Sequence, residues 1–156
     1  MLNYEDRPYR PCVGIVLKNN DGHILVGQRI DNSVEAWQMP QGGIDAGETA
    51  LDAGFREMME EIGTNNARFI AEHPTWLDYD IPLDLADRLW GGRYRGQTQK
   101  WMLFHFDGTD NDINIQTIEP EFRAWKWAEP EALPNLAVPF KRDVYIGVLN
   151  AFKDVL

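Results

Sequence analysis

Three glutamates, Glu57, Glu60 and Glu61, occur at spacings i, i+3 and i+4, so on a helix all three project from one side. Like charges this close repel one another, and a bound divalent cation would reverse the sign of that interaction. Oxygen ligands of this kind suit Mg²⁺ or Mn²⁺, whereas Cys12 is the single cysteine and there is no histidine pair to make a zinc site. By themselves, three carboxylates are also typical of a plain acidic solvent face.

The pattern around the glutamates predicts the helix that carries them. Thr49 followed by Asp52 resembles a capping box, and Gly63 supplies a stop signal. Four apolar residues fall on one stripe beside the glutamates: Leu51, Phe55, Met58 and Ile62. The glutamates therefore lie at the shoulder between core and solvent. One and two turns earlier in the same sector stand Ala50, Ala53 and Gly54, and we expect these small residues to leave room for a ligand.

A glycine-rich turn, QGGIDAGE, comes directly before the helix. Gly42, Gly43 and Gly47 can each adopt a positive φ, which brings backbone groups close to a ligand. The N-terminus of a helix also favours anions nearby. A glycine loop, a capped helix and an acidic cluster in succession favour a metal and phosphate site over a solvent face.

The other elements must position this helix. Asn19 to Gly22 form a polar turn between two apolar runs, which indicates a hairpin. We expect strands over residues 12–18, 23–29, 68–80, 100–106 and 122–127, a short extension of the sheet at 37–39, and a final helix opened by Pro139. Strands on both sides of a central helix predict an α/β or α+β layered domain, and we expect one domain over residues 1–156.

Composition limits the classes of function. The 156 residues include 44% hydrophobic residues, with no apolar run of ~18 residues and no apolar leader, which is typical of a soluble globular protein. A single cysteine favours a reducing cytoplasm. The net charge of −10 argues against a general affinity for nucleic-acid backbone. One segment differs: residues 88–106 contain Arg88, Arg93, Arg95 and Lys100 and no acid. That segment suits either one docked polyphosphate or an ordinary solvated loop.

The stretch Gly42–Thr64 resembles the Nudix box, G-x5-E-x7-R-E-U-x-E-E-x-G-U, in which U is aliphatic. Eight fixed positions match: Gly42, Glu48, Arg56, Glu57, Met58, Glu60, Glu61 and Gly63. Thr64 departs from the pattern, which concerns local packing rather than chemistry. Further stretches (YRPCVGIVL, WQMPQGGI, LWGGRYRGQTQKW, PEFRAWKW and FKRDVY) look like one branch of the Nudix hydrolases. That branch contains bacterial RNA pyrophosphohydrolases and plant-type asymmetrical diadenosine tetraphosphate hydrolases. The resemblance implies an α/β/α sandwich around a mixed sheet.

The resemblance also implies a role for each matching residue. Glu57, Glu60 and Glu61 match the metal-binding carboxylates, and the backbone carbonyl of Gln41 matches a further metal ligand. Glu121 matches an acid that reaches the metals from another element, although it also reads as an ordinary strand-edge carboxylate. Motif positions that match structural roles are Gly42, Glu48, Arg56 and Gly63.

Contacts to the substrate follow in the same way. Arg29 and Phe140 match a pair that stacks on a base, with Phe140 as a simple core residue the alternative. Arg7 matches a phosphate contact. We expect Arg95 and Lys100, in the basic segment, to bind substrate as well.

The implied reaction is attack of water on a nucleoside-capped polyphosphate with Mg²⁺ or Mn²⁺ as cofactor. We expect one of the three box glutamates to be the general base, with Glu121 as the alternative. The leading substrate is the 5′ end of triphosphorylated RNA, held without an extended groove; the alternative is asymmetric hydrolysis of diadenosine tetraphosphate to ATP and AMP. Housecleaning of damaged nucleotides fits the matches outside the box less well. A non-enzymatic nucleotide sensor is disfavoured because the box has kept all its carboxylates.

Overall fold

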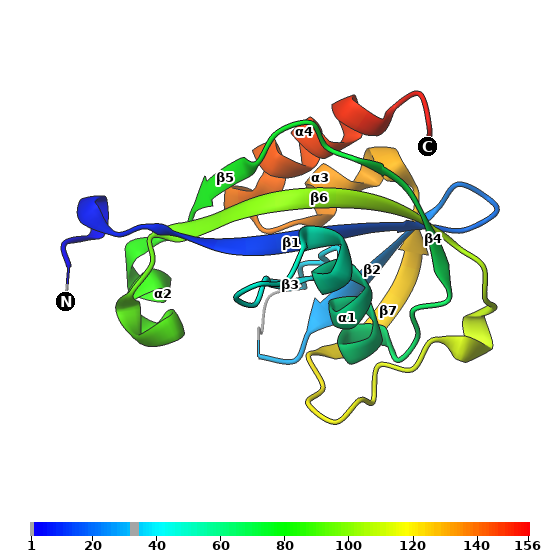
Figure 1. The fold of residues 1–156 in the computed structure, drawn as a ribbon, viewed down its shortest axis with the longest axis horizontal. Coiled ribbons are helices and arrows are strands. Elements are labelled where there is room, and N and C mark those ends of the chain that lie inside the picture. The colour runs from blue at the N-terminus through cyan, green and yellow to red at the C-terminus, as the bar shows by residue number, and fades with distance from the viewer. Residues whose placement is uncertain (1, 32–34) are drawn as a thin grey trace.

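The computed structural model describes residues 2–31 and 35–156, and seven strands of these residues form one sheet (Figure 1). The strands are β1 (Tyr9–Lys18), β2 (Ile24–Arg29), β3 (Gln41–Gly43), β4 (Ala67–Glu72), β5 (Leu77–Asp80), β6 (Gly96–Phe106) and β7 (Phe122–Ala128). The α-helices are α1 (Ala50–Ile62), α2 (Leu83–Arg88), α3 (Leu133–Leu136) and α4 (Arg142–Phe152). Short 3₁₀ turns are η1 (Tyr4–Asp6), η2 (Leu89–Gly92), η3 (Asp110–Asp112), η4 (Pro130–Ala132) and η5 (Pro139–Lys141).

The sheet is mixed, and helices cover both of its faces. β1 and β6 pair in parallel at its centre, whereas the other pairings are antiparallel, in the order β4-β6-β1-β2-β7. Figure 1 shows α1 on one face and α4 with α3 on the other. Alternate residues of β1 serve the two cores: Val13, Ile15 and Leu17 pack toward α1, and Val16 packs toward α4. The expected α/β/α sandwich around a mixed sheet is confirmed.

The expected hairpin forms between β1 and β2. Asn19 Oδ1 accepts hydrogen bonds from the backbone N–H groups of Asp21 and His23, both at 3.0 Å. Gly22 has φ 79°, the left-handed conformation that such a turn needs and that glycine adopts at no steric cost. The turn therefore sets the register in which β2 returns beside β1.

Helix α1 begins and ends at the expected residues. Thr49 Oγ1 accepts from the N–H of Asp52 at 3.1 Å, and Gly63 ends the helix in the left-handed conformation. The expectation that small residues leave room for a ligand is wrong at Gly54. A Cβ there would lie 3.1 Å from the Phe104 ring, so the ring of β6 fills that space and helix and sheet approach closely.

Other differences concern the segment between α1 and β6. The single strand expected over 68–80 is two strands, β4 and β5, which both pair with β6. β6 begins at Gly96, four residues before the expected start, and α2 with η2 lies between the two expected strands, where the sequence predicted no helix. Thr64 is buried at the aliphatic position, and its Oγ1 accepts from the N–H of Asn66 at 3.2 Å. No helix within 2–31 and 35–156 has both the length and the apolarity to cross a membrane.

Candidate active site

A cavity of about 520 Å³ opens where the ends of several strands meet α1, α2 and η5. On one side it reaches α1 through Glu57, and on the other it reaches η5 through Phe140 and Lys141. Glu121, just before β7, and Arg10, on β1, also line it. Segments far apart in the sequence therefore bring carboxylates and cations into one hollow.

The carboxylates on the α1 side are unequally buried. Glu61 is 1% exposed and Glu57 9% exposed, whereas the Glu60 side chain is 57% exposed. Glu61 Oε2 accepts from the backbone N–H of Gln41 at 3.0 Å, and Glu61 Oε1 is buried without a hydrogen-bond partner. Glu121 is exposed and faces the same cavity. The sequence interpretation of a shoulder between core and solvent holds for Glu57 and Glu61, but Glu60 points outward.

Burial perturbs the titration of these acids. Desolvation raises the pKa of Glu57 to about 7, although hydrogen bonding to Arg56 opposes the rise. The pKa of Glu61 is raised well above its usual range, first by burial and then by the neighbouring Glu121 carboxyl. Crowding acids in a buried place is costly without a compensating cation. A buried, unpartnered Glu61 oxygen beside Glu57 and Glu121 therefore fits a hard divalent cation.

The carboxylates expected to bind metal are not drawn together as a finished site. Among residues 2–31 and 35–156, no three His, Cys, Asp or Glu side chains are close enough to hold a metal ion. Arg56 Nη1 instead donates to Glu57 Oε1 at 2.9 Å and to Glu60 Oε2 at 3.2 Å. To complete a metal site, Glu57 and Glu60 must release the Arg56 guanidinium and bind a metal ion in its place.

Arg56 also joins the glycine loop to α1. It makes two hydrogen bonds of 2.8 Å to the Glu48 carboxylate and a third of 2.8 Å to the carbonyl of Gly43. Glu48 in turn accepts from the N–H of Asp45 at 3.0 Å. Hydrogen bonding to Arg56 lowers the pKa of Glu48 to about 2. The pair thus fixes where the loop lies against the helix.

Two consecutive glycines of the loop make room for opposite charges. Successive residues of a strand face opposite sides, so the missing side chains of Gly42 and Gly43 open different spaces. A Cβ at Gly42 would overlap the Glu57 carboxylate, and a Cβ at Gly43 would overlap the guanidinium of Arg10. The glycines are therefore required by close approach, which places an anion and a cation on either side of β3.

Aromatic and cationic groups also line the cavity. The Phe140 ring stacks on Tyr79, with centroids 5.9 Å apart and planes at 26°. Arg29 lies at the end of β2 and pairs with Asp31 through two hydrogen bonds of 2.8 and 2.7 Å. Lys141 is buried, and its Nζ donates to Gln38 Oε1 at 3.2 Å. Burial, assisted by the charge of Arg29, lowers the pKa of Lys141 to about 8.

Sequence reasoning missed two cations of this cavity, Arg10 and Lys141. Arg10 Nη1 donates to Gln97 Oε1 at 2.9 Å, and its guanidinium lies 4.8 Å from the centroid of the Trp90 ring. The alternation of side chains along β1 could have pointed to Arg10. It lies two residues before the buried Cys12 and so faces the same side of the strand. Lys141 follows Phe140 directly, but its burial depends on how η5 packs.

Three expected substrate contacts, Arg7, Arg95 and Lys100, lie outside the lining of this cavity, and their role stays a prediction. Arg7 is buried and pairs with Asp87 at 2.6 Å, and Arg95 makes a two-bonded pair with Asp80 at 3.0 and 3.1 Å. Lys100 is half-buried on β6 opposite Val13. None of the three lines the cavity. Of the four cations in the basic segment, Arg88 alone lines the cavity.

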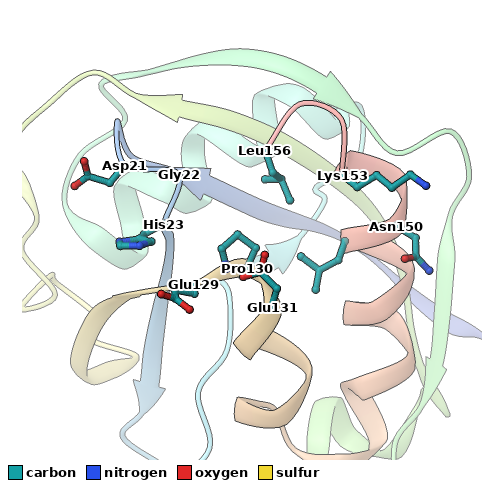
Figure 2. Close-up of a pocket in the computed structure, with 10 residues that line it drawn as sticks. Asp21, Gly22, His23, Glu129, Pro130, Glu131, Asn150, Lys153 and Leu156 are labelled. Carbon is teal, nitrogen blue, oxygen red and sulfur yellow. The ribbon is translucent and has the colours of Figure 1, made fainter.

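A second hollow of about 520 Å³ lies away from these groups, between the β1–β2 turn, η4 and the end of α4. Figure 2 shows Asp21 and His23 on one side of it, Glu129 and Glu131 below, and Asn150 and Lys153 on α4. These side chains are exposed, except that of His23, which is half-buried. This distal hollow therefore holds no desolvated charge.

Comparison with known proteins identifies the family. The NUDIX domain family matches residues 8–147. A curated RNA pyrophosphohydrolase of Roseobacter denitrificans is 55% identical over 148 residues, covering 94% of this chain and 92% of that protein. One of Rickettsia rickettsii is 49% identical over 151 residues, covering 97% and 94%.

Solved structures share the fold at lower identity. An Escherichia coli dihydroneopterin triphosphate pyrophosphohydrolase aligns with a TM-score of 0.68 at 24% identity, covering 93% of this chain and all of that one. A Caenorhabditis elegans Ap4A hydrolase aligns with a TM-score of 0.67 at 21% identity, covering 94% and 99%. The family model matches most of this chain, and the curated relatives are about 50% identical to it. This chain therefore belongs to the NUDIX family and is a hydrolase of pyrophosphate bonds.

Proposed function

We propose that this hydrolase removes pyrophosphate from the 5′ end of triphosphorylated RNA. The observation that carries the proposal is that one cavity joins Glu57, a buried carboxylate on α1, to aromatic and cationic side chains on η5 and β2. Such a cavity suits a ligand with a polyphosphate at one end and a base at the other. Relatives at 55% and 49% identity carry the name RNA pyrophosphohydrolase, which supports the same substrate here.

Nudix hydrolases generally need a divalent metal, and the donors of this cavity fit one. We propose that Glu57, Glu61, Glu121 and the backbone carbonyl of Gln41 hold it, with Glu60 joining once it leaves Arg56. Because every donor is an oxygen, Mg²⁺ or Mn²⁺ is the expected ion. When bound, the metal offsets the charge of the phosphates and lowers the pKa of the attacking water.

The side chains that line the cavity bind and orient the substrate. Arg10 binds a phosphate oxygen, in the role that the sequence interpretation gave to Arg7. Arg29 and Phe140 stack on either side of a base, and Lys141 donates to an acceptor on the same nucleotide. These contacts place the phosphorus to be attacked beside the carboxylates, which phosphoryl transfer requires more than covalent machinery.

A carboxylate takes the proton from the attacking water. Glu57 and Glu121 line the cavity, whereas Glu60 points outward and Glu61 lies beneath the surface. Of the four candidates, Glu57 and Glu121 are therefore the two proposed here as the general base. The acidic bulk of the protein, with a net charge of −10, fits an RNA that is held near its 5′ end only.

The test compares kcat/KM for a 5′-triphosphorylated oligoribonucleotide with kcat/KM for diadenosine tetraphosphate, each with Mg²⁺ and with Mn²⁺. We expect pyrophosphate as the product from RNA and a preference for RNA of about tenfold or more, which corresponds to one good contact of ~1.4 kcal/mol. A preference for diadenosine tetraphosphate would assign the asymmetric hydrolase activity instead. Hydrolysis of neither substrate by the wild-type protein would contradict both.

A further inference from the structure

Trp90 has an unusual backbone for a bulky residue. Among the described residues it is the one non-glycine residue with positive φ, at φ 49° and ψ 34°. Gly91 and Gly92 follow with φ 68° and 71°, so three residues in succession are left-handed. Glycine adopts this conformation freely, but a residue with a large side chain is strained in it. Such strain persists only where the surroundings enforce it, and it is frequent at functional sites.

The strained backbone places the Trp90 ring against Arg10. The guanidinium carbon of Arg10 lies 4.8 Å from the centroid of that ring, within the range of a cation–π contact. Tyr94 packs edge-on against Trp90, with centroids 5.9 Å apart and planes at 77°. Trp90 and Arg10 both line the cavity. The ring therefore contacts both Tyr94 and the guanidinium of Arg10.

The Arg10 guanidinium is held in place by its neighbours but has no acidic partner in the described part of the chain. Trp90 covers one side, Gln97 Oε1 accepts its Nη1 at 2.9 Å, and the absent side chain of Gly43 provides the space it occupies. Within the described residues, no carboxylate lies within ion-pair distance of Arg10, in contrast to Arg29, which pairs with Asp31. A guanidinium that is fixed in place without an acidic partner is available to an anion that enters the cavity.

We propose that Trp90 is a positioning residue, which pre-orients Arg10 to bind the phosphate chain of the substrate. The inference rests on the proposed function only in that Arg10 binds phosphate. The strain at Trp90 is then a feature of the site, because a relaxed backbone would turn the ring away from Arg10. Loss of the ring leaves the carboxylates untouched, so it should weaken phosphate binding without slowing the chemical step.

The test compares Trp90→Leu, which removes the aromatic face but keeps an apolar side chain, with Trp90→Phe, which keeps a face. Both variants retain a bulky residue in the left-handed backbone, so that strain is matched. The readouts are KM and kcat for the nucleoside polyphosphate that the wild type hydrolyses best, and the Kd for inorganic tripolyphosphate measured by calorimetry with Mg²⁺. We expect Trp90→Leu to raise KM and Kd about three- to tenfold, the range of one cation–π contact, with kcat within about twofold. Trp90→Phe should stay within about twofold of wild type.

A double-variant cycle separates positioning from general stability. In an Arg10→Ala background, Trp90→Leu should change KM and Kd by less than about twofold, because the residue it positions is gone. Additive effects of the two changes, a fall in kcat at unchanged KM, or equal loss in Trp90→Phe would overturn the proposal. Where Trp90→Leu fails to fold by circular dichroism, Trp90→Asn replaces it, because asparagine tolerates the left-handed backbone. The Kd for tripolyphosphate does not depend on turnover. It therefore tests the role of Trp90 even if the protein does not hydrolyse RNA.

Discussion

Two hollows lined by described residues have about the same volume, some 520 Å³ each, and they differ in the state of their charges. The active-site cavity contains Glu57 at 9% exposure and Lys141 at 7%, with the almost fully buried Glu61 behind Glu57. The acids and Lys153 of the distal hollow are exposed to water (Figure 2). Volume alone would not choose between the two.

The difference shows what marks a site in this protein. Burying a charge costs free energy, so a chain that keeps buried acids and a buried lysine must recover that cost through a ligand or through function. In the active-site cavity, burial raises the pKa of Glu57 to about 7 and lowers that of Lys141 to about 8. Exposed charges carry no such cost. The predictions below therefore pair a group in or beside the active-site cavity with one away from it.

The largest effect is expected from Glu61→Gln, with Glu131→Gln in the distal hollow as its matched control. Removing one buried carboxylate from the metal site should lower kcat by about a hundredfold or more, because metal stabilisation of the transition state is worth several kcal/mol. Glutamine has the same shape and removes a buried like charge, so the melting temperature should not fall. Glu131→Gln should leave kcat unchanged. Equal kcat for wild type and Glu61→Gln at saturating Mg²⁺ would remove Glu61 from the metal site.

The contrast also shows how much a sequence can specify. Spacing was enough for α1, because Thr49, Gly63 and the apolar stripe are local signals that tertiary packing did not override. The same spacing placed Glu57 and Glu61 on the buried shoulder. The neighbouring Glu60, one residue before Glu61, pairs with Arg56 at the surface. That ion pair depends on side-chain packing rather than on spacing.

The cations of the cavity could not be predicted equally well. Arg7 and Arg95 are expected substrate contacts that stay predictions, and each pairs with an acid from another element, Asp87 or Asp80. Arg10 reaches the cavity because Gly43 leaves it room across a β1–β3 pairing. These interacting residues are distant in the sequence. A single sequence does not show which charged side chains will form ion pairs.

Lys141 provides the second prediction, which concerns stability and pH. Its pKa is about 8 when folded and its unfolded value is near 10.4, so between these values the unfolded chain binds more protons. The free energy of unfolding of the wild type should therefore rise with pH through this window. Relative to Lys141→Met, the rise should total about 3 kcal/mol, since each pKa unit is worth about 1.4 kcal/mol.

Urea unfolding at pH 7 to 10.5 measures that difference, and Lys153→Met is the exposed control. Lys153 lies in water in the distal hollow, so its variant should follow the wild type at every pH. Taking the difference between wild type and variant removes other groups that titrate in the same range, the tyrosines among them. Parallel curves for wild type and Lys141→Met would mean that Lys141 is solvated in the folded protein.

The smallest effect separates two arginines that the sequence treated alike, Arg29 inside the active-site cavity and Arg95 outside it. Stacking of a base on a guanidinium or aromatic face is worth about 1–3 kcal/mol, so Arg29→Ala should raise KM for a nucleoside polyphosphate about tenfold. Arg95→Ala breaks a pair with Asp80 that water already screens, and KM should stay within about twofold of wild type. Steady-state kinetics at constant ionic strength measure both. A larger effect at Arg95 would mean that the phosphate chain leaves the cavity along β5, and the cavity lining would then not mark the whole substrate site.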